Sequence, residues 1–94
     1  MRRLRSHLER SEFKEALRLA QELRAEVPEN RDVLYMAAVS QRYLKLIPDA
    51  LATLAELEKH HPGYSRLFQE RGHCYVAMKD APQAIHAFLA ANGC

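Results

Sequence analysis

A repeat with a period of about 34 residues runs through the chain and limits what it can fold into. Ala16, Ala50 and Ala84 recur at this one constant interval. The same shift relates further residues to one another: Leu17 to Leu51 to Ile85, Ala20 to Leu54 to Phe88, Leu23 to Leu57 to Ala91, Phe13 to Ile47 to Ala81, and Pro28 to Pro62. A period of this length is typical of structural units that stack on their neighbours, because one unit alone cannot bury its apolar face.

Each unit shows the periodicity of two helices. Apolar residues recur at three- and four-residue spacing, as at Leu51, Leu54 and Leu57, which places them on one face of an α-helix. Pro48 and Pro82 fit the first turn of a helix, where a missing N–H is tolerated. The pattern therefore predicts an all-α chain without strands, with helices at about residues 2–10, 13–27, 31–45, 48–60, 64–79 and 82–92.

Small residues should allow the two helices of a unit to approach closely. In the expected packing, Ala38 and Gly72 of the first helices face Ala50 and Ala84 of the second helices. A glycine inside a helix costs about 1 kcal/mol relative to alanine. We therefore expect that packing against a neighbour forbids a side chain at Gly72.

The third unit resembles the tetratricopeptide repeat, whose pattern is aromatic, Gly, Tyr, then Ala, Phe, Ala, Pro. The residues that carry this resemblance are Phe68, Gly72, Tyr75, Ala84, Phe88 and Ala91. The second unit keeps Leu34, Ala38, Ala50, Leu54 and Pro62, and the first unit matches mainly through Phe13, Ala16, Ala20, Leu23 and Pro28. Gln41 and Arg71 stand where the family prefers Tyr and Leu, and we expect them to weaken packing.

The resemblance implies about three stacked helix-turn-helix units in a short right-handed superhelix with a concave groove. The units would span about residues 1–28, 31–62 and 65–94, the first and last being incomplete, within a single domain of residues 1–94. It also implies that this chain is a protein–protein interaction module without enzymatic activity, which holds an extended segment of a partner in the groove.

Helical spacing selects the residues that would line the groove on the first helix of each unit. They are Arg5, Asp32, Tyr35, Val39, Arg42, Tyr43, Arg66, Gln69 and His73. Arg42 and Arg66 can each grip a carboxylate through two parallel N–H donors, so an acidic protein or peptide is the expected partner. The alternative interpretation is that the tyrosines are ordinary half-buried helix residues and the arginines are solvated.

Composition and spacing argue against several other functions. The chain has 14 Lys and Arg against 12 Asp and Glu, so it lacks the basic excess that marks a nucleic-acid binder. No run of 18 apolar residues occurs, and no membrane association is expected. Cys74 and Cys94 are too few for a disulfide scaffold, which favours a reducing, cytoplasmic location.

Neither a metal site nor a thiol nucleophile is expected. His73 and Cys74 are helical neighbours whose side chains point about 100° apart, so they cannot converge on one ion or form a thiol–imidazole pair. Cys74 should instead be a small core residue. No cofactor is predicted.

Two alternative functions follow from the end of the repeat. Ile85 and Leu89 are expected on an apolar face that no polar capping helix covers, which would favour a homodimer through this face. Residues 32–35, 42–44 and 64–74 also resemble repeats that precede the catalytic domain in some bacterial sulfotransferase-like proteins. The chain would then be a non-catalytic accessory part of a larger enzyme.

Overall fold

The computed structural model describes residues 12–93 of the chain, which form helices and no strand. The helices are α2 (Phe13–Glu26), α3 (Arg31–Tyr43), α4 (Ile47–His60), α5 (Ser65–Ala77) and α6 (Ala81–Gly93). Each boundary lies within two residues of the expected one, and the helix expected at residues 2–10 lies outside the described residues. Within the described part, every helix is too short or too polar to cross a bilayer.

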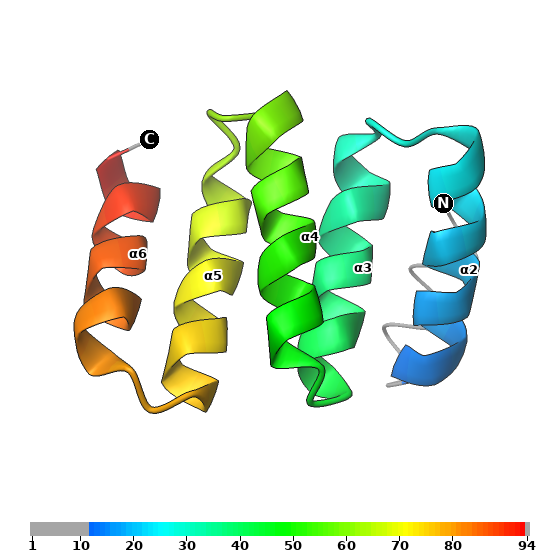
Figure 1. Cartoon of the computed structure of the whole chain (residues 1–94). Coiled ribbons are helices and arrows are strands. Elements are labelled where there is room, and N and C mark those ends of the chain that lie inside the picture. Colours follow the sequence, from blue (N-terminus) through cyan, green and yellow to red (C-terminus); the bar gives the residue numbers. More distant parts are fainter. Residues whose placement is uncertain (1–11, 94) are drawn as a thin grey trace.

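The helices stand side by side in the order of the sequence, from α2 at one end to α6 at the other (Figure 1). Consecutive helices from α2 to α6 pack against each other, and α3 also contacts α5. This last contact is the one between described helices that are not consecutive. It brings the first helices of the second and third units together, as expected for stacked units.

Two clusters of buried residues hold the row together. In the first, Ala16 and Ala20 of α2 pack with Met36 and Ala37 of α3. The second joins α3, α4 and α5, and contains Leu34, Ala38, Ala50, Leu54, Leu57, Leu67 and Cys74. Ala38 and Ala50 are both fully buried in this cluster, which confirms the expected close packing of α3 on α4.

Gly72 lies where α5 packs against α6. A Cβ atom at this position would come within 2.5 Å of Cε1 of Phe88, and within 2.8 Å of two further atoms of the same ring. The expectation that a neighbour forbids a side chain here is confirmed. The aromatic ring of Phe88 occupies the space that an alanine methyl group would need.

The two departures from the repeat pattern both have polar partners. Gln41 is buried, and its Oε1 atom lies 2.7 Å from the hydroxyl of Thr53 on α4. Arg71 donates to Glu58 at 2.9 Å, and its guanidinium lies 5.5 Å from the centre of the Phe68 ring. Both positions therefore carry contacts between helices in place of the apolar packing that the family pattern would supply.

The turns after α3 and α5 have the same unusual backbone. Lys45 and Lys79, which occupy equivalent positions in the second and third units, have φ angles of 69° and 61°, in the left-handed region that favours glycine. In the first turn the N–H of Leu46 donates to the carbonyl oxygen of Gln41 at 2.8 Å, and an equivalent bond of 2.9 Å closes the second turn. This is the Schellman arrangement of a helix end, with lysine in the position that glycine usually fills.

Candidate functional site

The candidate site is the surface formed by the first helices of the second and third units. We call it the α3–α5 surface, and its described residues are Asp32, Tyr35, Val39, Arg42 and Tyr43 on α3 and Arg66, Gln69 and His73 on α5. None of these residues is fully buried, and Tyr43, Arg66, Gln69 and His73 are exposed. Arg5, also expected on this surface, lies outside the described residues.

An ion pair joins the two helices beneath this surface. Arg42 of α3 donates to both carboxylate oxygens of Glu70 of α5, through Nε to Oε2 and through Nη2 to Oε1 at 3.2 Å. The Glu70 side chain is only 4% exposed and that of Arg42 20%. Burial would lower the pKa of Arg42, but the hydrogen bond and charge of Glu70 outweigh it, and the pKa is raised. Arg42 thus makes its two-donor contact within the chain, whereas the sequence suggested a contact with a partner.

Sequence reasoning did not select Glu70, although the repeat contains a signal for it. Glu70 is the third unit's equivalent of Met36, which is buried between α2 and α3. A carboxylate at the equivalent of an apolar, buried position requires a cation nearby, because an unpaired buried charge is strongly unfavourable. Comparing the units position by position would therefore have indicated that Glu70 needs a cationic partner, without naming Arg42.

Aromatic rings and guanidinium groups form a continuous series across the surface. The ring of Tyr35 meets that of Tyr64 edge to face, with centroids 5.8 Å apart. Arg66 lies 5.9 Å from the centre of the Tyr35 ring, and Arg31 lies 4.6 Å from the centre of the Tyr64 ring. Tyr64 precedes α5 and was not among the expected site residues. The series gives the surface flat apolar area flanked by two cations.

The phenol of Tyr35 is held in its neutral form at physiological pH. Its pKa is raised, chiefly by burial and next by the negative charge of Glu70, while Arg66 and Arg42 act in the opposite direction. The charged groups that act on Tyr35 belong to both helices, Arg42 to α3 and Glu70 and Arg66 to α5. A neutral phenol offers one O–H donor and can also accept a hydrogen bond.

A second aromatic contact lies where α2 meets α3. Phe13 and Tyr43 stack in parallel, with centroids 4.2 Å apart and planes 2° from parallel. Arg42 lies 4.4 Å from the centre of the Tyr43 ring, so its guanidinium contacts both this ring and Glu70. Phe13 was expected from the sequence as a repeat position but not as a site residue. The contact holds Tyr43 against the helix row while half of its surface stays exposed.

Arg66 differs from the other arginines of the site. It is exposed, and among the described residues it forms no ion pair within 4.0 Å, whereas Arg42 pairs with Glu70 and Arg31 lies 3.9 Å from Asp32. Its guanidinium is thus free to meet a carboxylate from outside the chain. The guanidinium carbon lies 5.9 Å from the centre of the Tyr35 ring.

The remaining predicted residues frame this centre. Asp32 and Val39 are half-buried on α3, and Gln69 is exposed on α5. The His73 ring meets Phe88 edge to face at 5.4 Å, so it links the surface to α6. The structure therefore brings Arg66 close to Tyr35 and Arg42 close to Tyr43. His73 instead contacts Phe88 of α6.

An open depression of about 360 Å³ lies at one end of the surface. It is lined by Arg31, His61, Gly63, Tyr64 and Ser65, none of which was an expected site residue. His61 spans from this depression to the turn before α3, where its Nε2 atom lies 2.6 Å from the carbonyl oxygen of Glu29. The depression adjoins the aromatic series through Tyr64, and it extends the accessible surface beyond Tyr35.

Residues that could carry chemistry lie apart from this surface or from one another. Cys74 is fully buried in the core, and burial raises the pKa of its thiol to about 11, so it is protonated and unreactive at neutral pH. The expectation of a buried core cysteine is confirmed. Within residues 12–93, no group of three or more His, Cys, Asp or Glu side chains could hold a metal ion.

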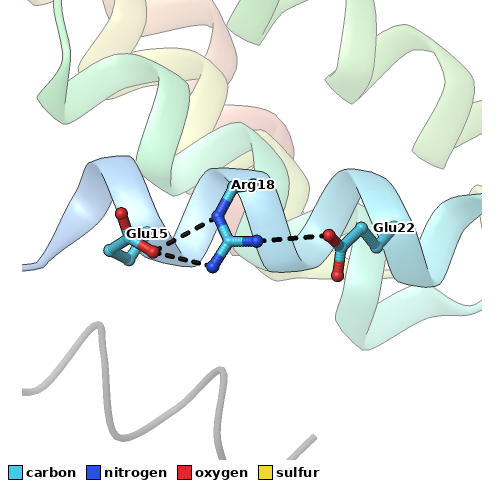
Figure 2. Close-up of polar contacts among 3 residues, drawn as sticks. All are labelled: Glu15, Arg18 and Glu22. Carbon is cyan, nitrogen blue, oxygen red and sulfur yellow. Dashed lines mark hydrogen bonds and ion pairs between the residues drawn. The ribbon is translucent and has the colours of Figure 1, made fainter.

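The outer face of α2 shows how the second helices meet solvent. Arg18 lies between Glu15 and Glu22, with contacts of 2.9 Å and 3.3 Å to their carboxylates (Figure 2). The hydrogen bond to Glu15 is the largest cause of the raised pKa of Arg18. All three side chains are more than half exposed, so such pairs add little stability. They make a solvated, charged face.

Comparison with known proteins identifies the fold. The sequence matches no protein-family model and no curated protein. A solved structure described as "MamA MSR-1 C2", a tetratricopeptide-repeat protein, superposes with a TM-score of 0.88 over 96% of this chain, at 17% sequence identity. The chain has a tetratricopeptide-like all-α repeat fold. It spans about half the length of the solved chain, of which it covers 52%.

Proposed function

We propose that the chain is a protein–protein interaction module that binds an extended peptide segment of a partner along the α3–α5 surface. The observation that carries this proposal is the Arg66 guanidinium, exposed beside the Tyr35 ring and without an ion pair among the described residues. A peptide lying across Tyr35 and Tyr64 would bury flat aromatic area, and a carboxylate on it would pair with Arg66.

An acidic peptide fits this surface better than a basic one. Glu70, the buried acid beneath it, is already neutralised by Arg42, and Asp32 lies near Arg31. A carboxylate from a partner therefore meets Arg66 without a competing acid of this chain within ion-pair distance in residues 12–93. The proposal involves no catalytic step and no cofactor.

Binding can be tested with a set of extended peptides that carry Glu and Asp, and with the same set carrying Gln and Asn. Fluorescence anisotropy would report binding to the whole 94-residue chain. Arg66→Gln should weaken the binding of the acidic peptides about tenfold and leave the binding of the amide peptides unchanged. Arg18→Gln, an exposed arginine on the outer face of α2, is the matched control and should change neither.

Two results would contradict the proposal. One is that no peptide binds at millimolar concentration. The other is that Arg66→Gln and Arg18→Gln have the same effect. The accessory role beside a sulfotransferase-like catalytic domain and the cytoplasmic location stay predictions, because nothing in the fold or the surface bears on either.

A further inference from the structure

Helix α6 differs from the other described helices in its lack of carboxylate, ammonium and guanidinium groups. Its sequence, APQAIHAFLAANG, contains no Asp, Glu, Lys or Arg, whereas each of α2 to α5 contains three or more. Ile85 is 60% exposed and Leu89 is 64% exposed, the highest values among the exposed large apolar residues. An apolar helix face of this kind is unusual on the outside of a soluble repeat.

Ile85 occupies a position that the chain covers in its other two units. Its equivalents in the repeat are Leu17 and Leu51, and both are partly buried. Leu17 packs on the cluster that contains Met36 of the following helix α3. Leu51 packs on the cluster that contains Leu67 of the following helix α5. A further helix stacked on α6 in the same way would therefore cover Ile85.

Leu89 is not explained by such a stacked helix. Its equivalents are Gln21 in α2 and Ala55 in α4, and both stay exposed although α3 and α5 follow. One more helix in the same arrangement would leave position 89 in water. A leucine here indicates an occupant that reaches around to the outer face of α6.

The loss of charge extends to that outer face. Glu15, Arg18 and Glu22 of α2 form the charged row shown in Figure 2. The residues at the equivalent positions of α4 are Asp49, Ala52 and Glu56, and those of α6 are Gln83, His86 and Ala90. The outer face of α6 therefore lacks the carboxylates that keep its equivalents in solvent.

We propose that α6 docks on α6 of a second copy of this chain, with Ile85 and Leu89 at the centre of the contact. The same helix on both sides makes a self-complementary interface. Because α6 has no Asp, Glu, Lys or Arg, two copies meet without repulsion between like charges. One helix per partner buries less than the roughly 1,200 Å² of stable interfaces, so the dimer is weak and depends on concentration.

The test is sedimentation equilibrium of the whole chain from about 10 μM to 1 mM, where a weak dimer populates. A reductant excludes a disulfide through Cys94. The variant is Leu89→Glu, and Ala55→Glu is its matched control, since it adds the same charge at the equivalent, exposed position of α4. We expect the wild type and Ala55→Glu to dimerise alike, and Leu89→Glu to raise the dissociation constant at least about tenfold.

Three outcomes would overturn the proposal. The first is a wild-type chain that stays monomeric at the highest concentration, which would leave α6 to a different protein or to a further segment. The second is equal behaviour of Leu89→Glu and Ala55→Glu. The third is that Ile85→Glu prevents association while Leu89→Glu does not, since an occupant that covers Ile85 but not Leu89 is a stacked helix. A folded Leu89→Glu monomer should still bind acidic peptides, so the α3–α5 proposal can fail or succeed separately.

Discussion

Arg42 on α3 and Glu70 on α5 form a two-point ion pair between the only described helices that touch without being consecutive. The repeat places Met36 at the equivalent of Glu70, so the second unit is apolar where the third is ionic. Removing one partner of a buried ion pair is costly, whereas replacing both partners with apolar residues often is not. We therefore expect the effects of substituting Arg42 and Glu70 on stability to be strongly coupled.

Removing one member of this pair should cost more stability than removing both. Arg42→Met leaves Glu70 buried without a cation, and we expect a loss of roughly 3 kcal/mol. Arg42→Met with Glu70→Met should recover most of this loss, because no unpaired charge is left buried and methionine already fills the position equivalent to Glu70 in the second unit. Urea unfolding of the wild type, both single variants and the double variant measures the coupling. A double variant less stable than Arg42→Met would contradict the account.

Gly72 and Phe88 should behave as a compensating pair. The equivalent residues in the second unit are Ala38, which is larger than Gly72, and Leu54, which is smaller than Phe88. Gly72→Ala should destabilise the chain by about 1–3 kcal/mol through its clash with the Phe88 ring, despite the better helix propensity of alanine. Gly72→Ala with Phe88→Leu reproduces the pair of the second unit and should be more stable than Gly72→Ala alone. Thermal unfolding followed by circular dichroism tests this order.

The left-handed lysines offer a stabilising change. Lys45→Gly and Lys79→Gly should each raise the free energy of unfolding by about 1 kcal/mol, because glycine adopts positive φ without a steric penalty. The effects should add, since the two turns are separate. Lys59→Gly, within α4, is the control and should lose about 1 kcal/mol. If all three variants lose stability, the proposed backbone strain is absent.

Stability should fall at alkaline pH through Cys74. Burial raises the pKa of its thiol from 9.0 to about 11, so the unfolded chain releases this proton at lower pH than the folded chain. The stability that the shifted pKa of Cys74 contributes is fully present below pH 9 and has been lost by pH 11. The loss lowers the free energy of unfolding by about 2–3 kcal/mol. Unfolding by urea from pH 8 to 11 should show a steeper decline for the wild type than for Cys74→Ala. Parallel curves for the two proteins would exclude a shifted thiol.

The helices could be predicted from the sequence because the apolar spacing and the internal repeat describe the same faces. Packing at Gly72 was predictable because a glycine in the middle of a helix lowers helix propensity and therefore indicates a close neighbour. The left-handed turns were not, because Lys45 and Lys79 have no sequence mark of positive φ. The partnership of Arg42 with Glu70 was missed because helical spacing within α3 assigns a residue to a face, but not to a partner on another helix.

The row of helices seen in Figure 1 also bears on how the chain folds. Apart from the contact between α3 and α5, the contacts among the described helices join helices that are consecutive in the sequence. Contacts of such short sequence separation close small loops, and chains dominated by them fold in microseconds to milliseconds. The hairpins α3–α4 and α5–α6 are closed by such contacts, whereas the Arg42–Glu70 ion pair can form only after α3 and α5 have met. If a substitution at Arg42 or Glu70 slowed folding, the slower rate would then report on the docking of α3 against α5 rather than on helix formation.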